Sequence, residues 1–328
     1  MTKTGSNVFA MYKLEGATYK TTSETNWKNF GHNLKITNLE IDNAVAKQYG
    51  IGNYDAASQV GLAFSGKIGL EFILGDPWMF SALTGNISVD AGATPYTHTF
   101  LNTAATPAAL SAMKSMTIDL SYAFSTASHH TLKGCVIDSL TMKLAVDEPV
   151  VCNLEMSFAD AAWTEAAATT RVNPTDAPYT FAYASVEFPT STTLNNVQSC
   201  DLTISRNPEI RRGLGSRTGA FFITKQSDYD IKLNLPFDVK TLMAYAFGSS
   251  SSSSPTTIMT ETSDMRILLD NGAATTASRK LDMNFTGVLV AKNSTPASVE
   301  ELMTQDATFS VRGLKSIIAS DGVATQPV

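Results

Sequence analysis

The sequence predicts a mainly β protein made of antiparallel sheets, in two tandem halves that each carry one short flanking α-helix. Three observations predict this fold class. Apolar residues recur at every second position in run after run, the helical period is scarce, and one half of the chain aligns with the other. Turn residues separate the alternating runs, as they do in an antiparallel β-sandwich or barrel. The 328 residues suffice for two domains or for one large β domain.

Each alternating run predicts a strand with one buried face, because successive side chains of a strand point to opposite sides of the sheet. In chain order the runs cover residues 68–74, 116–122, 140–146, 152–158, 179–183, 231–237, 265–269 and 281–285. His129 and His130 lie in a stretch of small polar residues and are predicted to form a hairpin tip.

Two short helices are predicted, one in each half. Asp76 precedes Pro77, which is the preferred order for an N-cap and a first helical residue, and Gly85 follows as the glycine that ends the helix. Asp238 and Gly248 enclose the second candidate helix in the same way. Both segments directly follow an alternating strand, so the two halves share an order of elements.

The two halves also align residue by residue, at a constant offset of 163 positions. Within residues 33–85 this alignment gives nine identities, where about three or four are expected by chance. The identities are Asn33/Asn196, Leu39/Leu202, Ile41/Ile204, Gly50/Gly213, Gly52/Gly215, Ala57/Ala220, Ile68/Ile231, Leu70/Leu233 and Gly85/Gly248. We therefore predict a tandem duplication, with a first domain at residues 1–165 that includes an N-terminal arm, a linker at 166–178, and a second domain at 179–328.

The stretch Gly213-Leu214-Gly215-Ser216 resembles a phosphate-binding loop at first sight, because arginines precede and follow it. A phosphate loop needs Gly-Lys-Ser/Thr leading into a helix, or three spaced glycines at a strand-to-helix turn. Here a β-branched, aromatic and polar segment follows, and the counterpart at Gly50 and Gly52 lacks the arginines. The sequence therefore favours a glycine-permitted turn in a long loop.

Composition and motifs exclude several function classes. The formal net charge is −6 and no long basic cluster is present, which disfavours tight binding to nucleic acid. The four histidines accompany no metal-binding or serine-hydrolase motif, so we predict no catalytic residue, no cofactor and no metal. Three widely spaced cysteines, Cys135, Cys152 and Cys200, are predicted to be buried free thiols. No segment approaches 18 apolar residues, so no membrane span is expected.

Two segments, residues 27–85 and 185–238, resemble the central segment of the major tail tube proteins of tailed phages and archaeal tailed viruses. The shared pattern is an alternating strand with a polar, Asn-rich turn, a loop with Gly-x-Gly followed by Ser-Arg or Asn, and a strand leading into a helix. The first segment also has a Phe-Gly entry and an aromatic helix. The resemblance implies two tail-tube-like domains, each a β-sandwich or split barrel with one helix.

The resemblance also implies how copies assemble. Strands of neighbouring subunits continue one another's sheets into a ring of sixfold or pseudo-sixfold symmetry, and long loops contact the next ring. Carried over to this chain, residues 43–66 and 206–229 are the inter-ring loops. The candidate contact residues within them are Gly50, Gly52, Asn53, Tyr54, Arg211, Arg212, Gly213, Gly215 and Arg217.

The function expected from this resemblance is that of a structural virion protein, not an enzyme. It is made in the host cytoplasm, joins the tail, and forms stacked rings through which viral DNA passes. Two domains per chain predict a ring of three chains, with six chains as the rival. Tape-measure, tail terminator and baseplate or tip proteins are the expected partners. The alternative is a double β-sandwich adhesin or carbohydrate-binding module, and an enzyme on a β scaffold has the least support.

Overall fold

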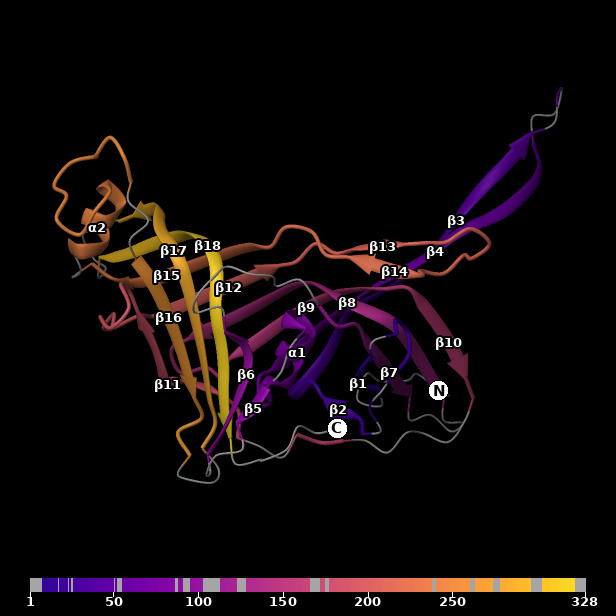
Figure 1. Cartoon of the computed structure of the whole chain (residues 1–328), viewed down its shortest axis with the longest axis horizontal. Coiled ribbons are helices and arrows are strands. Elements are labelled where there is room, and N and C mark those ends of the chain that lie inside the picture. The colour runs from indigo at the N-terminus through magenta and orange to yellow at the C-terminus, as the bar shows by residue number, and fades with distance from the viewer. Residues whose placement is uncertain are drawn as a thin grey trace.

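The computed structural model describes residues 8–16, 18–22, 24, 26–49, 51, 55–85, 88–90, 95–102, 113–122, 128–165, 172–174, 177–237, 240–259, 263–273, 278–295 and 303–321. These residues are mainly β, with antiparallel pairing and two short α-helices (Figure 1). All eight predicted strands and both predicted helices are present. The predicted hairpin tip at His129 and His130 is wrong, because both lie inside a strand.

The first half contains ten strands among its described residues, together with a 3-10 turn (Pro77–Met79) and α1 (Phe80–Thr84). The strands are β1 (Val8–Leu14), β2 (Lys28–Asn29), β3 (His32–Tyr49), β4 (Ala56–Ile73), β5 (Ser88–Asp90), β6 (Tyr96–Asn102), β7 (Met116–Tyr122), β8 (Ser128–Ala145), β9 (Val151–Phe158) and β10 (Asp160–Thr164).

The second half contains eight described strands and α2 (Lys240–Phe247). They are β11 (Thr180–Glu187), β12 (Ser199–Ser205), β13 (Glu209–Arg211), β14 (Phe221–Ile223), β15 (Asp228–Pro236), β16 (Ser263–Asp270), β17 (Lys280–Ser294) and β18 (Thr304–Asp321).

The ends of the helices follow the predicted capping residues. The Asp76 carboxylate accepts a hydrogen bond from the Trp78 backbone at 2.9 Å, and Gly85 ends α1 at a φ of 75°. Gly248 follows α2 at a φ of 127°. Asp238 lies outside the described residues, so its predicted N-cap role stays a prediction.

The two halves pair their strands in the same order. In the first half the order is β1-β7-β8-β9-β4-β3, and in the second it is β11-β16-β17-β18-β15-β12. The register agrees as well, because Leu39 pairs with Ile68 and Leu202 pairs with Ile231. The repeat in the sequence is therefore also a repeat in topology. The domain boundaries near residues 165 and 179 stay a prediction.

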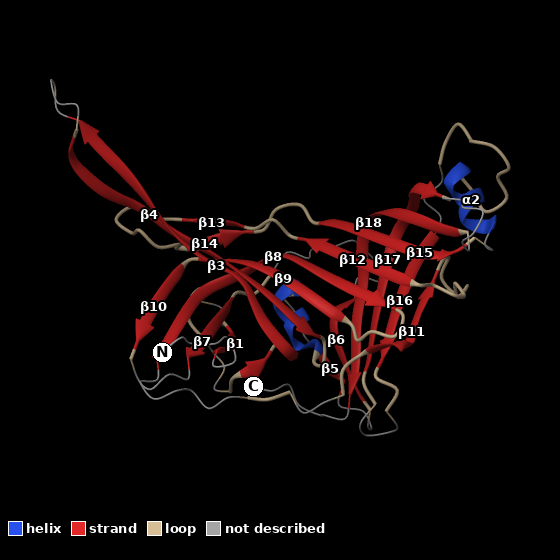
Figure 2. Ribbon diagram, turned by 180° about the vertical axis from the view of Figure 1, so that it is seen from behind, coloured by secondary structure: helices blue, strands red, loops and turns tan. Residues whose placement is uncertain are grey.

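Two strand pairs join the halves. β12 of the second half pairs with β8 of the first, and β6 of the first half pairs with the end of β18 (Figure 2). The second joint carries a buried contact between His98 Nε2 and Asp321 Oδ1 at 2.7 Å, with the Trp78 ring packed on the imidazole. Buried apolar side chains of both halves form one core cluster. The halves are thus held together by continuous sheet and shared core.

Candidate assembly surfaces

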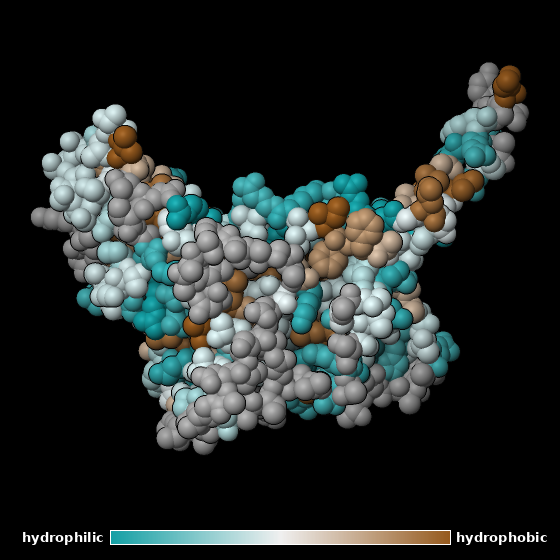
Figure 3. Space-filling view, viewed as in Figure 1, coloured by the Kyte–Doolittle hydropathy of each residue, from teal (hydrophilic) through white to brown (hydrophobic). Residues whose placement is uncertain are grey.

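The most exposed element is a long hairpin, which we call the arm: residues 43–66 at the outer ends of β3 and β4. The sequence predicts a long loop here, whereas the structure has two paired strands that project from the body (Figure 1). Apolar side chains lie exposed along it (Figure 3), namely Val45, Tyr49, Ile51, Val60 and Leu62. Exposed apolar side chains on a projecting hairpin are a feature of surfaces that bind other protein chains, which makes the arm a candidate assembly surface.

The counterpart of the arm in the second half takes a different path. Residues 206–227, which we call the second-half loop, contain the short β13–β14 hairpin and lie against the first half at the base of the arm. Arg212 Nη2 donates to the Phe64 carbonyl at 2.8 Å, and Arg217 Nη2 donates to Asn43 Oδ1 at 3.0 Å. The Phe64 backbone N–H donates to the Arg217 carbonyl at 2.9 Å. The second-half loop thus holds the arm where it leaves the body.

The other predicted contact residues divide into two groups. Arg211 pairs with Glu209 at 2.7 Å and is half exposed. Gly215 has a φ of 81°, and the Ser216 N–H donates to the Gly213 carbonyl at 3.3 Å, which confirms the predicted turn. Gly50, Gly52, Asn53 and Tyr54 lie outside the described residues, so their role stays a prediction.

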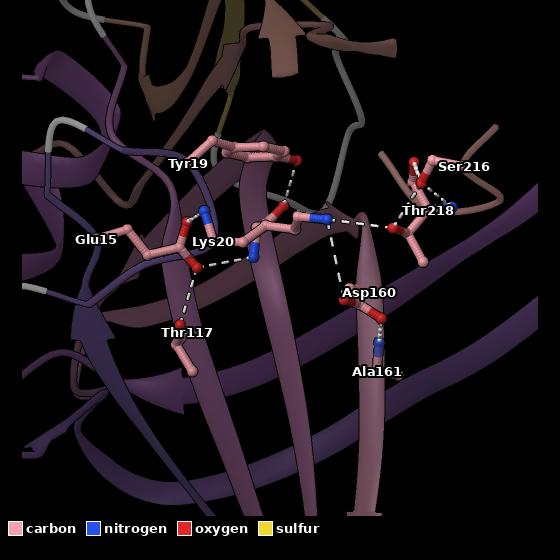
Figure 4. Close-up of polar contacts among 9 residues, drawn as sticks. Glu15, Tyr19, Lys20, Thr117, Asp160, Ala161, Ser216 and Thr218 are labelled. Carbon is pink, nitrogen blue, oxygen red and sulfur yellow. Dashed lines mark hydrogen bonds and ion pairs between the residues drawn. The ribbon is translucent and has the colours of Figure 1, made fainter. Parts of the chain in front are cut away.

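A buried carboxylate, that of Glu15, is connected to the second-half loop through Lys20 (Figure 4). Glu15 is 1% exposed and accepts hydrogen bonds from the Gly134 N–H and the Thr117 hydroxyl, both at 2.8 Å. It also accepts from the Lys20 backbone at 2.7 Å. The Lys20 ammonium then reaches the Thr218 hydroxyl at 3.1 Å. This network connects the end of β1 to the second half, and no spacing in the sequence points to it.

Three first-half side chains bring together the residue types of a hydrolase triad. Ser121 Oγ lies 2.9 Å from His129 Nδ1, and the Asp119 carboxylate lies 3.1 Å from the same nitrogen. A catalytic triad needs the serine and the aspartate on opposite nitrogens of the imidazole. All three side chains are also buried. The cluster therefore has the geometry of a structural hydrogen-bond network that binds β7 to β8.

No metal centre is found in the part of the chain that the structure describes. No group of three or more histidine, cysteine, aspartate or glutamate side chains among those residues is arranged so that it could hold a metal ion. None of the described helices is long and apolar enough to cross a membrane.

All three cysteines are free and buried, as predicted. Burial raises the pKa of each thiol, that of Cys200 to about 12. We expect no reaction with a small thiol reagent in the folded protein and three reacting thiols in denaturant. Absorbance of the released reporter gives the count, and fast labelling of the native chain would contradict the buried placement.

A family model for phage tail tube proteins matches residues 57–311. The chain belongs to the phage tail tube protein family. The match begins in β4 and ends in β18, so it includes both helices, the second-half loop and the joint between β8 and β12. None of the curated proteins matches the chain. As a member of this family the protein is a structural component of the virion tail. Tail tube proteins are generally non-enzymatic, and they assemble with copies of themselves and with other tail proteins.

Proposed function

We propose that the protein is the major tail tube subunit, and that its copies form stacked rings around a channel for viral DNA. The observation that carries this proposal is the arm, whose strands expose apolar side chains. Among the described strands β3 pairs only with β4, so one edge of the arm is available to another chain. Tape-measure, tail terminator and baseplate or tip proteins are the proposed partners. A net charge of −6 fits a conduit that does not retain DNA phosphates.

The two repeats support a ring of three chains. Each chain supplies two units with the same strand order, so three chains place six such units around one axis. A head-to-tail contact that closes on itself ends lateral growth, while the axial faces stay free for stacking. We propose that the arm tip, with Gly50, Gly52, Asn53 and Tyr54, contacts the next ring. Arg211, Gly213 and Gly215 are proposed to do so from the second-half loop.

Arg212 and Arg217 take a different proposed role. Their guanidinium groups already donate to Phe64 and Asn43 at the base of the arm. We propose that they act on the contact between rings by fixing the direction in which the arm leaves the body.

Electron microscopy of the purified protein tests the proposal. We expect negatively stained hollow tubes, formed by the chain alone or on a tape-measure fragment, and a ring mass of three chains. Six chains per ring would contradict the trimer. A chain that stays monomeric at every concentration, with and without the fragment, would contradict assembly itself.

A further inference from the structure

The joint between β8 and β12 shows, within one chain, how the edge of one repeat binds the next. Ser199–Ser205 of β12 pairs antiparallel with β8, from Ala145 at one end to Ser139 at the other. The joint continues past the strand end, where the Arg206 N–H donates to the Asp138 carbonyl at 2.8 Å. β12 follows β7 along one side of β8, while β9 and β10 take the other side.

Both strands of this joint have a counterpart that pairs with no described strand on the matching edge, although Asn293 of β17 donates to Met243 Sδ of α2 at 3.7 Å. β3 corresponds to β12, and it pairs only with β4 among the described strands. β17 corresponds to β8, and β16 covers one side of it over residues 280–288 alone. On that side, residues 289–294 pair with no described strand, whereas on the opposite side β18 pairs with β17 as far as Ser294.

A one-residue shift in strand pairing, present in both repeats, shows which residues of β17 correspond to which residues of β8. Ile137 pairs with Met156, and the pairing then shifts by one residue before Ser139. In the second half Val290 pairs with Phe309, and the same shift precedes Lys292. Met156 and Phe309 are themselves counterparts, because they pair with Ile68 and Ile231. Lys292 therefore occupies the position of Ser139, and Ser294 that of Thr141.

The exposure of one apolar side chain on β3 indicates that no strand lies beside this edge among the described residues. Ile204 is fully buried in the β8–β12 joint, whereas its counterpart Ile41 is 44% exposed on β3. Each isoleucine pairs with the corresponding strand of its own repeat, where Ile204 lies opposite Tyr229 and Ile41 opposite Gly66, and only Ile204 has a second strand on its other side. An apolar side chain that is buried in one repeat and exposed in the other indicates a surface awaiting a second chain.

We infer that residues 40–42 of β3 pair antiparallel with residues 292–294 of β17 in a second copy of this chain. In this register Asp42 lies opposite Lys292 and Glu40 lies opposite Ser294. The Asp42 and Lys292 side chains are both exposed, and neither forms an ion pair within the described residues. The inference rests on the proposed self-assembly and adds which edges meet, in which register, and through which charges. Each chain has one edge of each kind, so the contact is head-to-tail, and it gives the proposed ring where the rotation between neighbours closes.

Mixing two single-cysteine variants tests this register directly. The internal counterparts of Glu40 and Ser294 are Thr203 and Thr141, whose hydroxyl oxygens lie 3.2 Å apart. We expect Glu40→Cys protein mixed with Ser294→Cys protein to form a disulfide-linked dimer under mild oxidation, seen on a non-reducing gel. Neither variant alone should give this product, because the three natural cysteines are buried.

A matched control checks the register. Asn38 lies on the same face of β3 as Glu40, two residues nearer the N-terminus. Mixing Asn38→Cys with Ser294→Cys therefore places the two thiols diagonally across the joint, too far apart for a disulfide. We expect at least tenfold less dimer. Equal yields from both mixtures would overturn the proposed register.

Charge reversal gives a second, independent measurement. Asp42→Lys and Lys292→Asp should each reduce the fraction of protein in rings, and the double variant should restore it. Glu148→Lys, an exposed reversal in the turn between β8 and β9, serves as the control. Sedimentation gives the ring fraction. Tubes that form normally while the cysteine mixture gives no dimer, or while the charge reversals have no effect, would overturn this joint and leave the proposed function standing. A wild-type chain that never assembles would overturn both.

Discussion

Glu15→Ala is expected to lower the free energy of unfolding by about 3 kcal/mol, because it leaves buried donors without an acceptor. The Gly134 N–H and the Thr117 hydroxyl both donate to this carboxylate, and neither position is open to water. The Lys20 backbone loses its acceptor in the same change. Urea unfolding of the unassembled chain, followed by tryptophan fluorescence, measures the loss.

Two further variants separate burial from charge. Glu148→Ala removes an exposed carboxylate and should change the free energy of unfolding by less than about 0.5 kcal/mol. Glu15→Gln keeps one carbonyl acceptor, so its loss in the free energy of unfolding should lie between those of Glu15→Ala and Glu148→Ala. If Glu15→Ala unfolds at the same urea concentration as the wild type, the network in Figure 4 contributes nothing to stability.

Gly31→Ala is expected to destabilise the protein by about 3 kcal/mol or more, because a methyl group at this position meets the backbone. Gly31 has a φ of 147°, and a Cβ here would lie 2.2 Å from the Ile73 carbonyl oxygen. His32, the next residue, pairs with Ile73 where β3 begins, so the strand cannot move away without losing its register. Thermal unfolding of the unassembled variant gives the effect.

The glycines of the second-half loop supply a graded control for that measurement. Gly215 has a φ of 81° but open space around it, so Gly215→Ala should cost about 1 kcal/mol. At Gly213 the φ is not positive and no atom lies within 4 Å of the added methyl, so Gly213→Ala should be almost neutral. Equal effects at all three positions would show that backbone contact at Gly31 is not the cause.

The core strands and helix ends could be predicted because burial leaves a periodic trace in the sequence. Leu140, Met142 and Leu144 alternate toward the core of β8, and Asp76 and Gly85 mark the ends of a helix whose residues are buried throughout. β18 did not show in the alternation, because its buried positions include Gln305 and Ala307 and because a shift in its pairing with β17 between Leu314 and Ser316 breaks the period.

The assembly surfaces could be predicted only in part. Val45, Tyr49, Val60 and Leu62 are apolar but exposed, so their pattern does not distinguish a projecting hairpin from a loop. The joint between β8 and β12 joins residues about sixty positions apart, and no local propensity encodes such a contact. Arg212 and Arg217 have no arginine counterpart in the first half, yet the sequence does not indicate their acceptors, Phe64 and Asn43, which lie in the other half of the chain.

The covalent connection between the two repeats has a kinetic consequence. Because β8 and β12 belong to one chain, their joint forms at an effective concentration in the millimolar range, independent of how dilute the protein is. In the proposed ring of three chains, half of the six joints therefore form as each chain folds, and only three encounters between molecules remain. Because one joint lies within the chain and the other lies between chains, the residues that form the two joints can differ. The internal joint places Ser205 opposite Ser139 without charge, while the joint between molecules can carry the Asp42–Lys292 pair that selects the correct neighbour.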